Sequence, residues 1–172
     1  TNLASGTVPT ARLGSGTASS STVLYGDQTY KAEPTGGKIG QVLQGTRSST
    51  LTVGSGTYAT LGVPTSITPV ATSSKVLIMV TLPCNNKSGT DAEGMNAQIY
   101  KDGSALKKFG GNVFYQGATD AVVQSVSYNF LDSPSTTSAV EYNVFVARAG
   151  SSDIEINTNA TNCSITLMEV LA

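Results

Sequence analysis

The sequence contains no histidine and no tryptophan, and the first absence removes whole classes of chemistry. Without histidine there is no Ser-His-Asp or Cys-His catalysis and no His-ligated metal site. Glycosidases need two carboxylates flanking the scissile bond. The candidate acidic pairs here are Asp91 with Glu93 and Asp153 with Glu155, and their two-residue spacing is typical of a solvated strand or turn surface. We therefore expect a protein without enzymatic activity.

Charge is scarce as well. Only 12% of the residues are charged and the net charge is −1, so no basic field exists to attract nucleic acid or an anionic membrane. No apolar run approaches the roughly 20 residues of a membrane helix, and KVLIMVTL at 75–82 has the length of a buried strand. We expect no nucleic-acid partner and no membrane insertion.

Cysteine is nearly absent, since only Cys84 and Cys163 occur and neither lies in a C-x-x-C spacing. Two free, packed thiols in a reducing cytoplasm are expected, with one bridge between them as the alternative. Calcium held by Asp91, Glu93 and loop carbonyls is the remaining metal hypothesis, but no EF-hand spacing supports it. No glycine pattern indicates a nucleotide, and we expect no cofactor and no metal.

The amino-acid composition changes along the chain, from small polar residues to short apolar runs. Residues 1–38 contain eighteen Gly, Ser and Thr, whereas short apolar runs recur from residue 39 onward. This shift predicts an extended connector or shaft over 1–38 and a folded domain over 39–172. Because the sequence begins at Thr1 without an initiator Met, we also expect it to be part of a longer polypeptide or a trimmed product.

The folded part has almost no helix signal and reads as all-β. Asp102-Gly103 predicts a hairpin with a type I′ turn. Eight or nine strands at this spacing favour a jelly-roll-like antiparallel β-sandwich. The predicted strands cover residues 39–46, 57–68 with a break at Pro64, 75–82, 95–101, 104–109, 122–132, 138–148, 153–157 and 162–171.

Alternation indicates which faces are buried. Val122, Val126, Tyr128 and Phe130 share one face of their strand, as do Val140, Tyr142, Val144 and Val146 of theirs. Strand 75–82 is apolar on both faces, with Val76, Ile78 and Val80 on one side and Leu77 and Met79 on the other. The sandwich covers one side, so we expect a neighbouring subunit, or alternatively an overlying loop, to cover the other.

The connector has its own apolar residues in VLY at 23–25. A chain of Gly, Ser and Thr loses too much conformational entropy to order itself alone. Three copies wound about an axis would satisfy each other's backbone groups and bury Val8, Leu13, Val23, Leu24 and Tyr25 between them. A disordered linker is the alternative.

Four motifs resemble a known family. VPTARLGSGTASSSTVLYGDQTYK at 8–31 is similar to IPTARLGSGTASSSTFLRGDGTW-like segments in tail fibre proteins of tailed bacteriophages, notably those infecting marine cyanobacteria. KIGQVLQGTRSSTLT at 38–52, SITPVATSSKVLIMVTL at 66–82, SYNFLDSPSTTSAVEYNV at 127–144 and SITLMEVLA at 164–172 resemble the C-terminal domain that follows there. The motifs occur in the family's order, but Tyr25 stands where Arg is frequent and Tyr30 where Trp is common.

The resemblance implies a homotrimeric fibre of the virion whose C-terminal β-sandwich is a distal tip that binds a host-surface glycan or protein. Trimer contacts would come from Val23, Leu24, Tyr25, Leu77 and Met79, and other virion proteins would bind upstream sequence. The same module on the capsid, as a head fibre or decoration protein, is the nearest alternative, and a depolymerising tailspike is a second.

Two segments, 84–94 and 109–121, match no family motif and are predicted as the variable, host-facing loops. Sugar hydroxyls can hydrogen-bond to amide, ammonium and carboxylate groups, and aromatic rings can stack on an apolar sugar face. The predicted receptor-binding residues are Asn85, Asn86, Lys87, Asp91, Glu93, Phe114, Tyr115 and Gln116. Alternatively, Phe109, Phe114 and Tyr115 belong to a strand and pack inward.

Overall fold

The computed structural model describes Pro9 and residues 12–32, 38–87, 93–116, 123–158 and 161–171, except for the side chains of 84–87, 112 and 114–116. The chain divides into two compact units, Thr1–Gly37 and Lys38–Ala172. We call them the N-terminal unit and the sandwich, and describe each by itself.

The described part of the N-terminal unit is a short antiparallel hairpin of β1 (Thr22–Leu24) and β2 (Tyr30–Ala32). The turn between them is closed by the Tyr25 N–H, which donates to the Thr29 carbonyl over 2.9 Å. Within this turn Gln28 adopts a positive φ of 60°, which is uncommon for a residue with a side chain. The carboxylate of Asp27 accepts from Lys31 and Thr29, and these bonds lower its pKa to about 2.

The G-S-G stretch at 14–16 crosses this hairpin. The Ser15 N–H donates to the Gln28 carbonyl over 2.9 Å, and the Ser15 carbonyl accepts from the Tyr30 N–H over 2.8 Å. Gly16 has a φ of 93°, and a Cβ there would lie 2.9 Å from the Tyr30 carbonyl oxygen. The glycines are therefore needed because two backbones meet where a side chain has no room.

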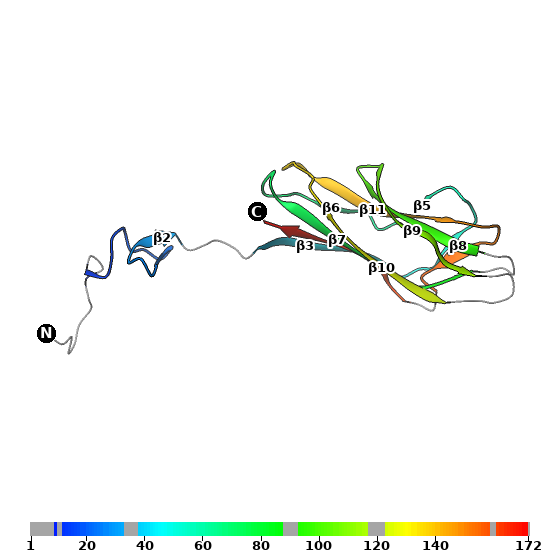
Figure 1. Ribbon diagram of the computed structural model, residues 1–172, viewed down its shortest axis with the longest axis horizontal. Coiled ribbons are helices and arrows are strands. Elements are labelled where there is room, and N and C mark those ends of the chain that lie inside the picture. Colours follow the sequence, from blue (N-terminus) through cyan, green and yellow to red (C-terminus); the bar gives the residue numbers. More distant parts are fainter. Residues whose placement is uncertain are drawn as a thin grey trace. The chain divides into compact units, whose positions relative to one another are not determined.

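The sandwich consists of two antiparallel layers (Figure 1). One layer has the order β3-β13-β7-β10, with the short strands β4 and β12 continuing it at one end, and the other has the order β5-β11-β8-β9 with β6 beside β11. The chain crosses from one layer to the other after β4, β6, β7, β9, β10 and β11, in the jelly-roll manner. The strands are β3 (Ile39–Arg47), β4 (Leu51–Val53), β5 (Ala59–Thr60), β6 (Thr65–Ile67), β7 (Lys75–Lys87), β8 (Glu93–Lys101), β9 (Ser104–Gln116), β10 (Gln124–Asp132), β11 (Val140–Arg148), β12 (Ile154–Ile156) and β13 (Cys163–Val170).

The predicted all-β sandwich is confirmed, and so is the hairpin at Asp102-Gly103. Both turn residues have positive φ values, 48° and 76°, and Lys101 pairs with Ser104 on either side of them. Four strands are longer than predicted, β3 by one residue, β8 by two, and β7 and β9 by several. β7 runs past Pro83 through an irregularity opposite β10, because a bulge tolerates a residue without an N–H.

The core lies between the layers and follows the predicted alternation. Tyr142, Val144 and Val146 of β11 are fully buried, and Tyr128 and Phe130 of β10 pack against the same core at half burial. In β7, Ile78 and Val80 point inward. Leu77 and Met79 lie half-buried on the opposite face, as predicted; what covers that face remains a prediction.

One buried polar cluster ties the two layers together. Asp132 of β10 accepts from the Tyr142 hydroxyl over 2.6 Å and from the Lys101 ammonium over 2.9 Å, so a carboxylate of one layer binds two side chains of the other. Burial on its own raises the pKa of Asp132, but these two donors hold it below its ordinary value. Burial also raises the pKa of Tyr142, which keeps the hydroxyl protonated as a donor.

Candidate functional site

The predicted receptor-binding residues gather at one end of the sandwich, which we call the candidate end. β7 finishes there at Lys87 and β8 begins at Glu93, while β9 finishes at Gln116 and β10 begins at Gln124. The ladders place Glu93 beside Gln116 and Asn85 beside Gln124. The structure thus brings together the two sequence segments that were proposed separately.

Asn85, Asn86 and Lys87 do not lie in a loop, so that part of the prediction is wrong. They form the last residues of β7, where Asn86 pairs with Glu155 and Lys87 with Ile154 of β12. Because Asn and Lys have low strand propensity, the sequence predicted that this strand ends at residue 82. In the structure, pairing with β12 extends the strand despite that low propensity. Asp91 lies outside the described residues.

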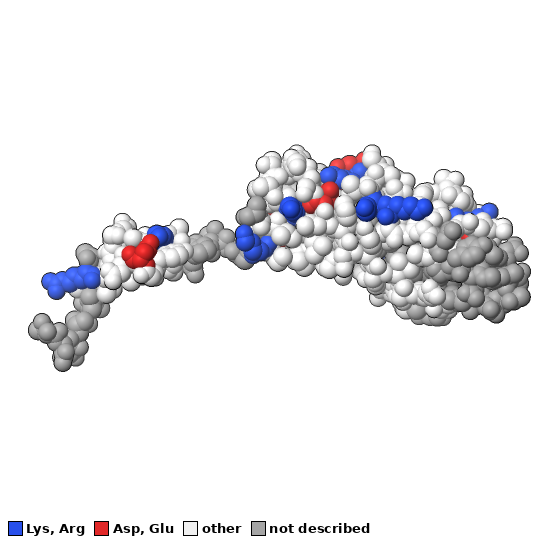
Figure 2. All heavy atoms as spheres, in the orientation of Figure 1, with Lys and Arg blue, Asp and Glu red and all other residues white. Residues whose placement is uncertain are grey.

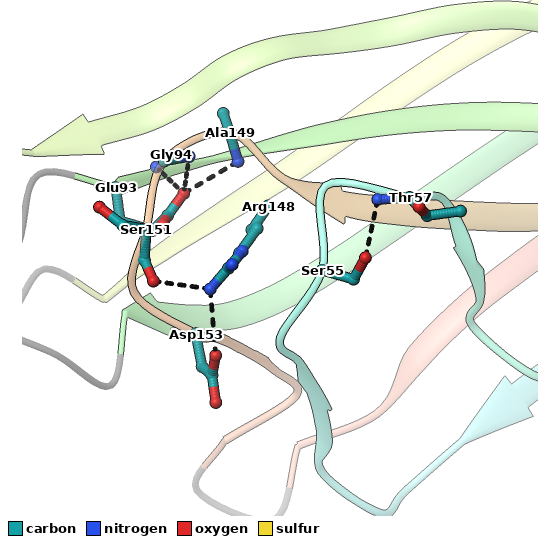
Figure 3. A network of polar contacts seen from close by, with 9 residues as sticks. Ser55, Thr57, Glu93, Gly94, Arg148, Ala149, Ser151 and Asp153 are labelled. Atoms are coloured by element: carbon teal, nitrogen blue, oxygen red, sulfur yellow. Dashed lines mark hydrogen bonds and ion pairs between the residues drawn. The ribbon is translucent and has the colours of Figure 1, made fainter.

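The prediction that Glu93 binds the receptor is also wrong, because its side chain is fully buried and cannot offer its carboxylate to a sugar. Figure 3 shows Oε1 turned toward the turn after β11, where it accepts from the Ala149 N–H over 2.9 Å and from the Gly150 N–H. The Gly94 N–H donates to the same oxygen over 2.9 Å. Among the described residues Oε2 has no hydrogen-bond partner. Glu93 is a structural residue that fixes the turn.

The same turn is held from its other side by Arg148 (Figure 3). Its Nη1 donates to the Ser151 carbonyl over 2.6 Å and lies 3.5 Å from the Asp153 carboxylate. The Arg148 N–H donates to the Ser55 carbonyl, which attaches the turn to the β4–β5 connection. Residues 149–153 were not predicted as part of the site, although Gly-Ser-Ser-Asp between two strands is a turn signal.

The second predicted loop, 109–121, is also partly a strand, because β9 extends to Gln116. Phe109 packs inward, as the alternative prediction proposed. Phe109 lies in β9, packs against the core and stacks on Tyr128 with 5.0 Å between ring centroids. The backbones of Phe114, Tyr115 and Gln116 continue β9. The prediction stopped at residue 109 because Gly110-Gly111 normally ends a strand, whereas here the ladder passes them with register shifts.

Buried groups elsewhere in the sandwich are structural rather than chemical. Glu169 of β13 is fully buried and accepts from the Val70 N–H over 2.7 Å and from the Gln41 amide over 3.1 Å. Burial on its own raises the pKa of Glu169, but these donors hold it below its ordinary value. Cys163 is a free thiol, and burial raises its pKa to about 11.

A half-buried aromatic pair that the sequence analysis did not single out lies on the outer face of the β5-β11-β8-β9 layer. Tyr100 and Phe145 stack there with ring centroids 4.0 Å apart, beside the Asn143 amide, which donates to the Thr60 hydroxyl. The only signal in the sequence was the outward position of Phe145, which follows the polar outward residues Glu141 and Asn143. The pair covers the sheet and shields the backbone pairing of β8 with β11.

The predicted trimer contacts lie on surfaces of both units. Val23 and Leu24 are 37% and 43% exposed, and Tyr25 is half-buried under the Lys31 ammonium, 5.2 Å from its ring centroid. An open hollow of 510 Å³ lies beside this hairpin. Its lining residues are Arg12, Leu13, Gly14, Ser15, Asp27 and Gln28.

Metal ligands and charged side chains are not concentrated in the described part of the chain. No group of three potential metal ligands occurs among them. The visible face in Figure 2 shows its charged side chains scattered singly or in small mixed groups, with no extended patch of one sign. No helix in the described part of the chain is long and apolar enough to cross a membrane.

No protein-family model matches the sequence, and no curated protein is significantly similar to it. Among solved structures, the chain is similar to proteins of infectious bursal disease virus. The VP2 subviral particle shares 13% identity with a TM-score of 0.39, over 77% of this chain and 37% of that one. The structure of the Gt strain of this virus gives 12% sequence identity and a TM-score of 0.43, over 83% of this chain and 40% of that one.

The T=1 particles of the same virus give 12% identity and a TM-score of 0.40, over 83% of this chain and 38% of that one. This chain therefore spans less than half of the length of each of these virus-particle proteins. At such values the likeness carries no argument about function.

Proposed function

We propose that this chain is the C-terminal region of a trimeric virion fibre of a tailed bacteriophage, with the sandwich as a tip that binds a host-surface glycan or protein. The sequence resemblance supports this over both units. The proposed location is the virion, and the proposed role is adhesion without enzymatic activity. Two structural features support it: the exposed apolar residues of the N-terminal unit, and the entry of the chain into the sandwich opposite the candidate end.

The observation that carries the proposal is an N-terminal unit whose described residues have defined backbone bonds but form no buried core. None of the described residues of this unit is buried, although its backbone is bonded across the hairpin through Ser15, Gln28 and Tyr30. The apolar residue Leu13 is 42% exposed, and Val23 and Leu24 of β1 are exposed as well. An isolated hairpin of this kind is marginal in water, so further copies are needed to bury these side chains.

Strand direction separates the attachment of the sandwich from its candidate end. Ile39 starts β3 and pairs with Val170, which in turn pairs with Lys75 at the start of β7. Lys87, at the finish of β7, belongs to the candidate end. The chain therefore enters the sandwich at the end opposite the candidate end, which is the arrangement that a distal tip requires.

Two other functions remain as alternatives. A head fibre or capsid decoration module would use the same fold with a different upstream attachment. A tailspike depolymerase would need two carboxylates across an open cleft, whereas Glu93, one of the acidic candidates, is buried and engaged with the turn after β11. The alternative of a decoration module is therefore the stronger of the two.

The direct test is competition for adsorption. Purified protein 1–172 should reduce phage adsorption to a susceptible host in proportion to its concentration. Because three tips per fibre multiply the effective concentration, single-site dissociation constants near about 1 mM would suffice. The triple variant Asn85→Ala, Asn86→Ala, Lys87→Ala should compete less well at an unchanged melting temperature.

A matched control changes three exposed residues at the opposite end of the sandwich, Ser133→Ala, Thr137→Ala and Ser138→Ala. It should compete like the wild type. If the wild-type protein does not compete at all, the decoration module becomes the better proposal. If the two triple variants compete equally well, the binding site lies away from the end of β7.

A further inference from the structure

The stacked rings of Tyr100 and Phe145 occupy the outer face of the β5-β11-β8-β9 layer, with their centroids 4.0 Å apart. Each ring therefore covers only one face of the other. The ladders place Ala105 of β9 opposite Tyr100, and Thr60 of β5 opposite Phe145. Both of these neighbours are exposed and have small side chains, so the ring beside each of them is not enclosed from that side.

Polar groups that are free to bind a ligand surround the pair. Gln98 lies opposite Phe145, and its half-buried amide has no hydrogen-bond partner among the described residues. In the same part of the chain the hydroxyls of Tyr58 and Tyr100 have none either. Burial raises the pKa of Tyr58 and the nearby Tyr100 raises it further, so the two hydroxyls lie near each other. Asn143, opposite Tyr100, adds a second amide.

Charge is sparse on this face. Lys108 lies opposite Gln98 at the β9 edge, and Glu141, of the opposite sign, lies toward the turn that contains Asp102. The ammonium groups of Lys101 and Lys107 contact side chains of β10 in the other layer. An anionic ligand such as a nucleic acid needs several cations together, which one exposed lysine does not supply. The face therefore suits a neutral ligand.

The backbone beneath the pair cannot be used by a peptide. β11 is paired with β8 on one side and with β5 and β6 on the other, while β8 is paired with β11 and β9. A peptide that binds by strand addition needs a free edge, and one in the polyproline conformation needs a groove between aromatic rings. Here the two rings contact each other and leave no groove between them. A ligand of this face must be recognised by side chains alone.

A sugar matches this set of side chains. Its apolar C–H face can lie on an aromatic ring, while its hydroxyls exchange hydrogen bonds with amides and hydroxyls at the ring's edge. We propose that the face formed by Tyr100, Phe145 and Gln98, which we call the aromatic platform, binds a neutral glycan. One sugar ring lies on Tyr100 beside Ala105, and its hydroxyls bind the amides of Gln98 and Asn143. Because the platform is an open strand face, it suits an extended chain of sugars.

The aromatic platform is separate from the candidate end. Tyr100 lies seven positions after Glu93, the first residue of β8, which is about 20 Å along a strand. The platform also belongs to the layer that does not contain Leu77 and Met79, so a subunit covering those residues would leave it exposed. It adds a glycan site to the proposed function but does not depend on host adsorption.

Saturation-transfer difference NMR tests the platform, because it detects weak binding and identifies the ligand protons that touch the protein. The full chain 1–172 is titrated with four neutral probes: maltohexaose, cellohexaose, mannohexaose and N-acetylated chitohexaose. Oligogalacturonate is the anionic comparator and decaproline the peptide comparator. At least one neutral probe should bind, with the C–H protons of a ring face saturated most strongly, and neither comparator should bind.

Ala105 provides the sharpest pair of variants, because it is exposed and changing it removes no group of the platform. Ala105→Ile places a larger side chain beside the Tyr100 ring and should weaken binding of the probe about tenfold. Ala105→Ser keeps the side chain small and should bind like the wild type. Both variants should keep the melting temperature of the wild type.

Two further pairs separate the ring from the amide. Tyr100→Leu removes the ring and should weaken binding about as much as Ala105→Ile, whereas Tyr100→Phe keeps the ring and should retain most of the affinity. Gln98→Ala should weaken binding through the loss of its amide. Gln44→Ala, which changes an exposed glutamine of β3 in the other layer, should have no effect.

Failure of all four neutral probes to bind would overturn the proposal. Equal affinity of Ala105→Ile and Ala105→Ser would do the same, and so would binding of a comparator that Ala105→Ile abolishes. The triple variant of Asn85, Asn86 and Lys87 should bind the probe like the wild type. Loss of binding in that variant, with Ala105→Ile unaffected, would place the glycan at the candidate end and remove the platform. Loss in Ala105→Ile with unchanged competition for adsorption would support the platform as a separate site.

Discussion

Glu93 offers the most specific prediction, because one buried oxygen accepts three backbone N–H groups. Replacing Glu93 by Ala removes this acceptor and leaves the amides of Gly94, Ala149 and Gly150 without it. Glu93→Gln keeps an oxygen acceptor of the same shape but removes the charge. The two variants therefore separate the loss of charge from the loss of the acceptor.

The magnitude follows from the number of bonds. A hydrogen bond to a charged group contributes about 1.5–3 kcal/mol, but bonds sharing one oxygen are not additive, so Glu93→Ala should lower the free energy of unfolding by about 3 kcal/mol. Glu93→Gln should cost about half of that. The loss should be local as well as global, since the Glu93 carboxylate joins β8 to the turn that follows β11 (Figure 3).

Urea denaturation at one fixed protein concentration measures the global effect, and amide hydrogen exchange at Ala149 and Gly150 measures the local one. Glu141→Ala is the matched control, because Glu141 is an exposed glutamate in the adjacent strand β11. It should change the free energy of unfolding by less than about 0.5 kcal/mol. Unchanged stability of Glu93→Ala, with Ala149 and Gly150 exchanging as slowly as before, would refute the role assigned to this carboxylate.

Three further predictions concern other parts of the chain. Asp132 has a lowered pKa in the folded state, so its contribution is complete above the ordinary carboxyl pKa of about 3.9 and is lost as the pH falls through the folded value. The stability difference between wild type and Asp132→Asn should therefore shrink below about pH 4 in acid titrations, and a difference constant down to pH 2 would contradict this. Gln28→Gly should relieve the positive φ of 60° and slow tryptic cleavage after Lys31, whereas Gln28→Ala should not. At pH 8 the buried thiol of Cys163, with a pKa of about 11, should react with a thiol reagent no faster than the protein unfolds.

Much of the sandwich could be predicted because its strands alternate cleanly. The buried residues of β11 follow from period two alone, and the turn at Asp102-Gly103 follows from residues that tolerate positive φ. β4 and the hairpin of the N-terminal unit were not predicted, since strands of three residues are too short to show a period. The extensions of β7 and β9 pass Pro83 and Gly110, and only pairing with neighbouring strands compensates for these breaks.

The candidate site was less predictable because its geometry depends on long-range contacts. Glu93 looked like a surface carboxylate beside Asp91, but two of its three partners lie more than fifty positions later in the chain. The outer face of the β3-β13-β7-β10 layer shows the same difficulty. Each of Val42, Leu77, Leu131 and Met168 is an ordinary outward residue in its own strand, and only the register of three ladders places them together.

Under the proposed function the protein is anchored at one end and bound at the other, and the order of strands β3, β13 and β7 then has a mechanical consequence. A pull on the chain enters the sandwich at Ile39, the first residue of β3, and a bound host would resist near Lys87, the last residue of β7. β13 lies between these two strands and is antiparallel to both. The opposing forces therefore run along the strands, perpendicular to the ladder hydrogen bonds. The bonds of each ladder are loaded together in shear instead of opening one after another, so the strand order resists tension in the direction in which a virion tethered to a cell would apply it.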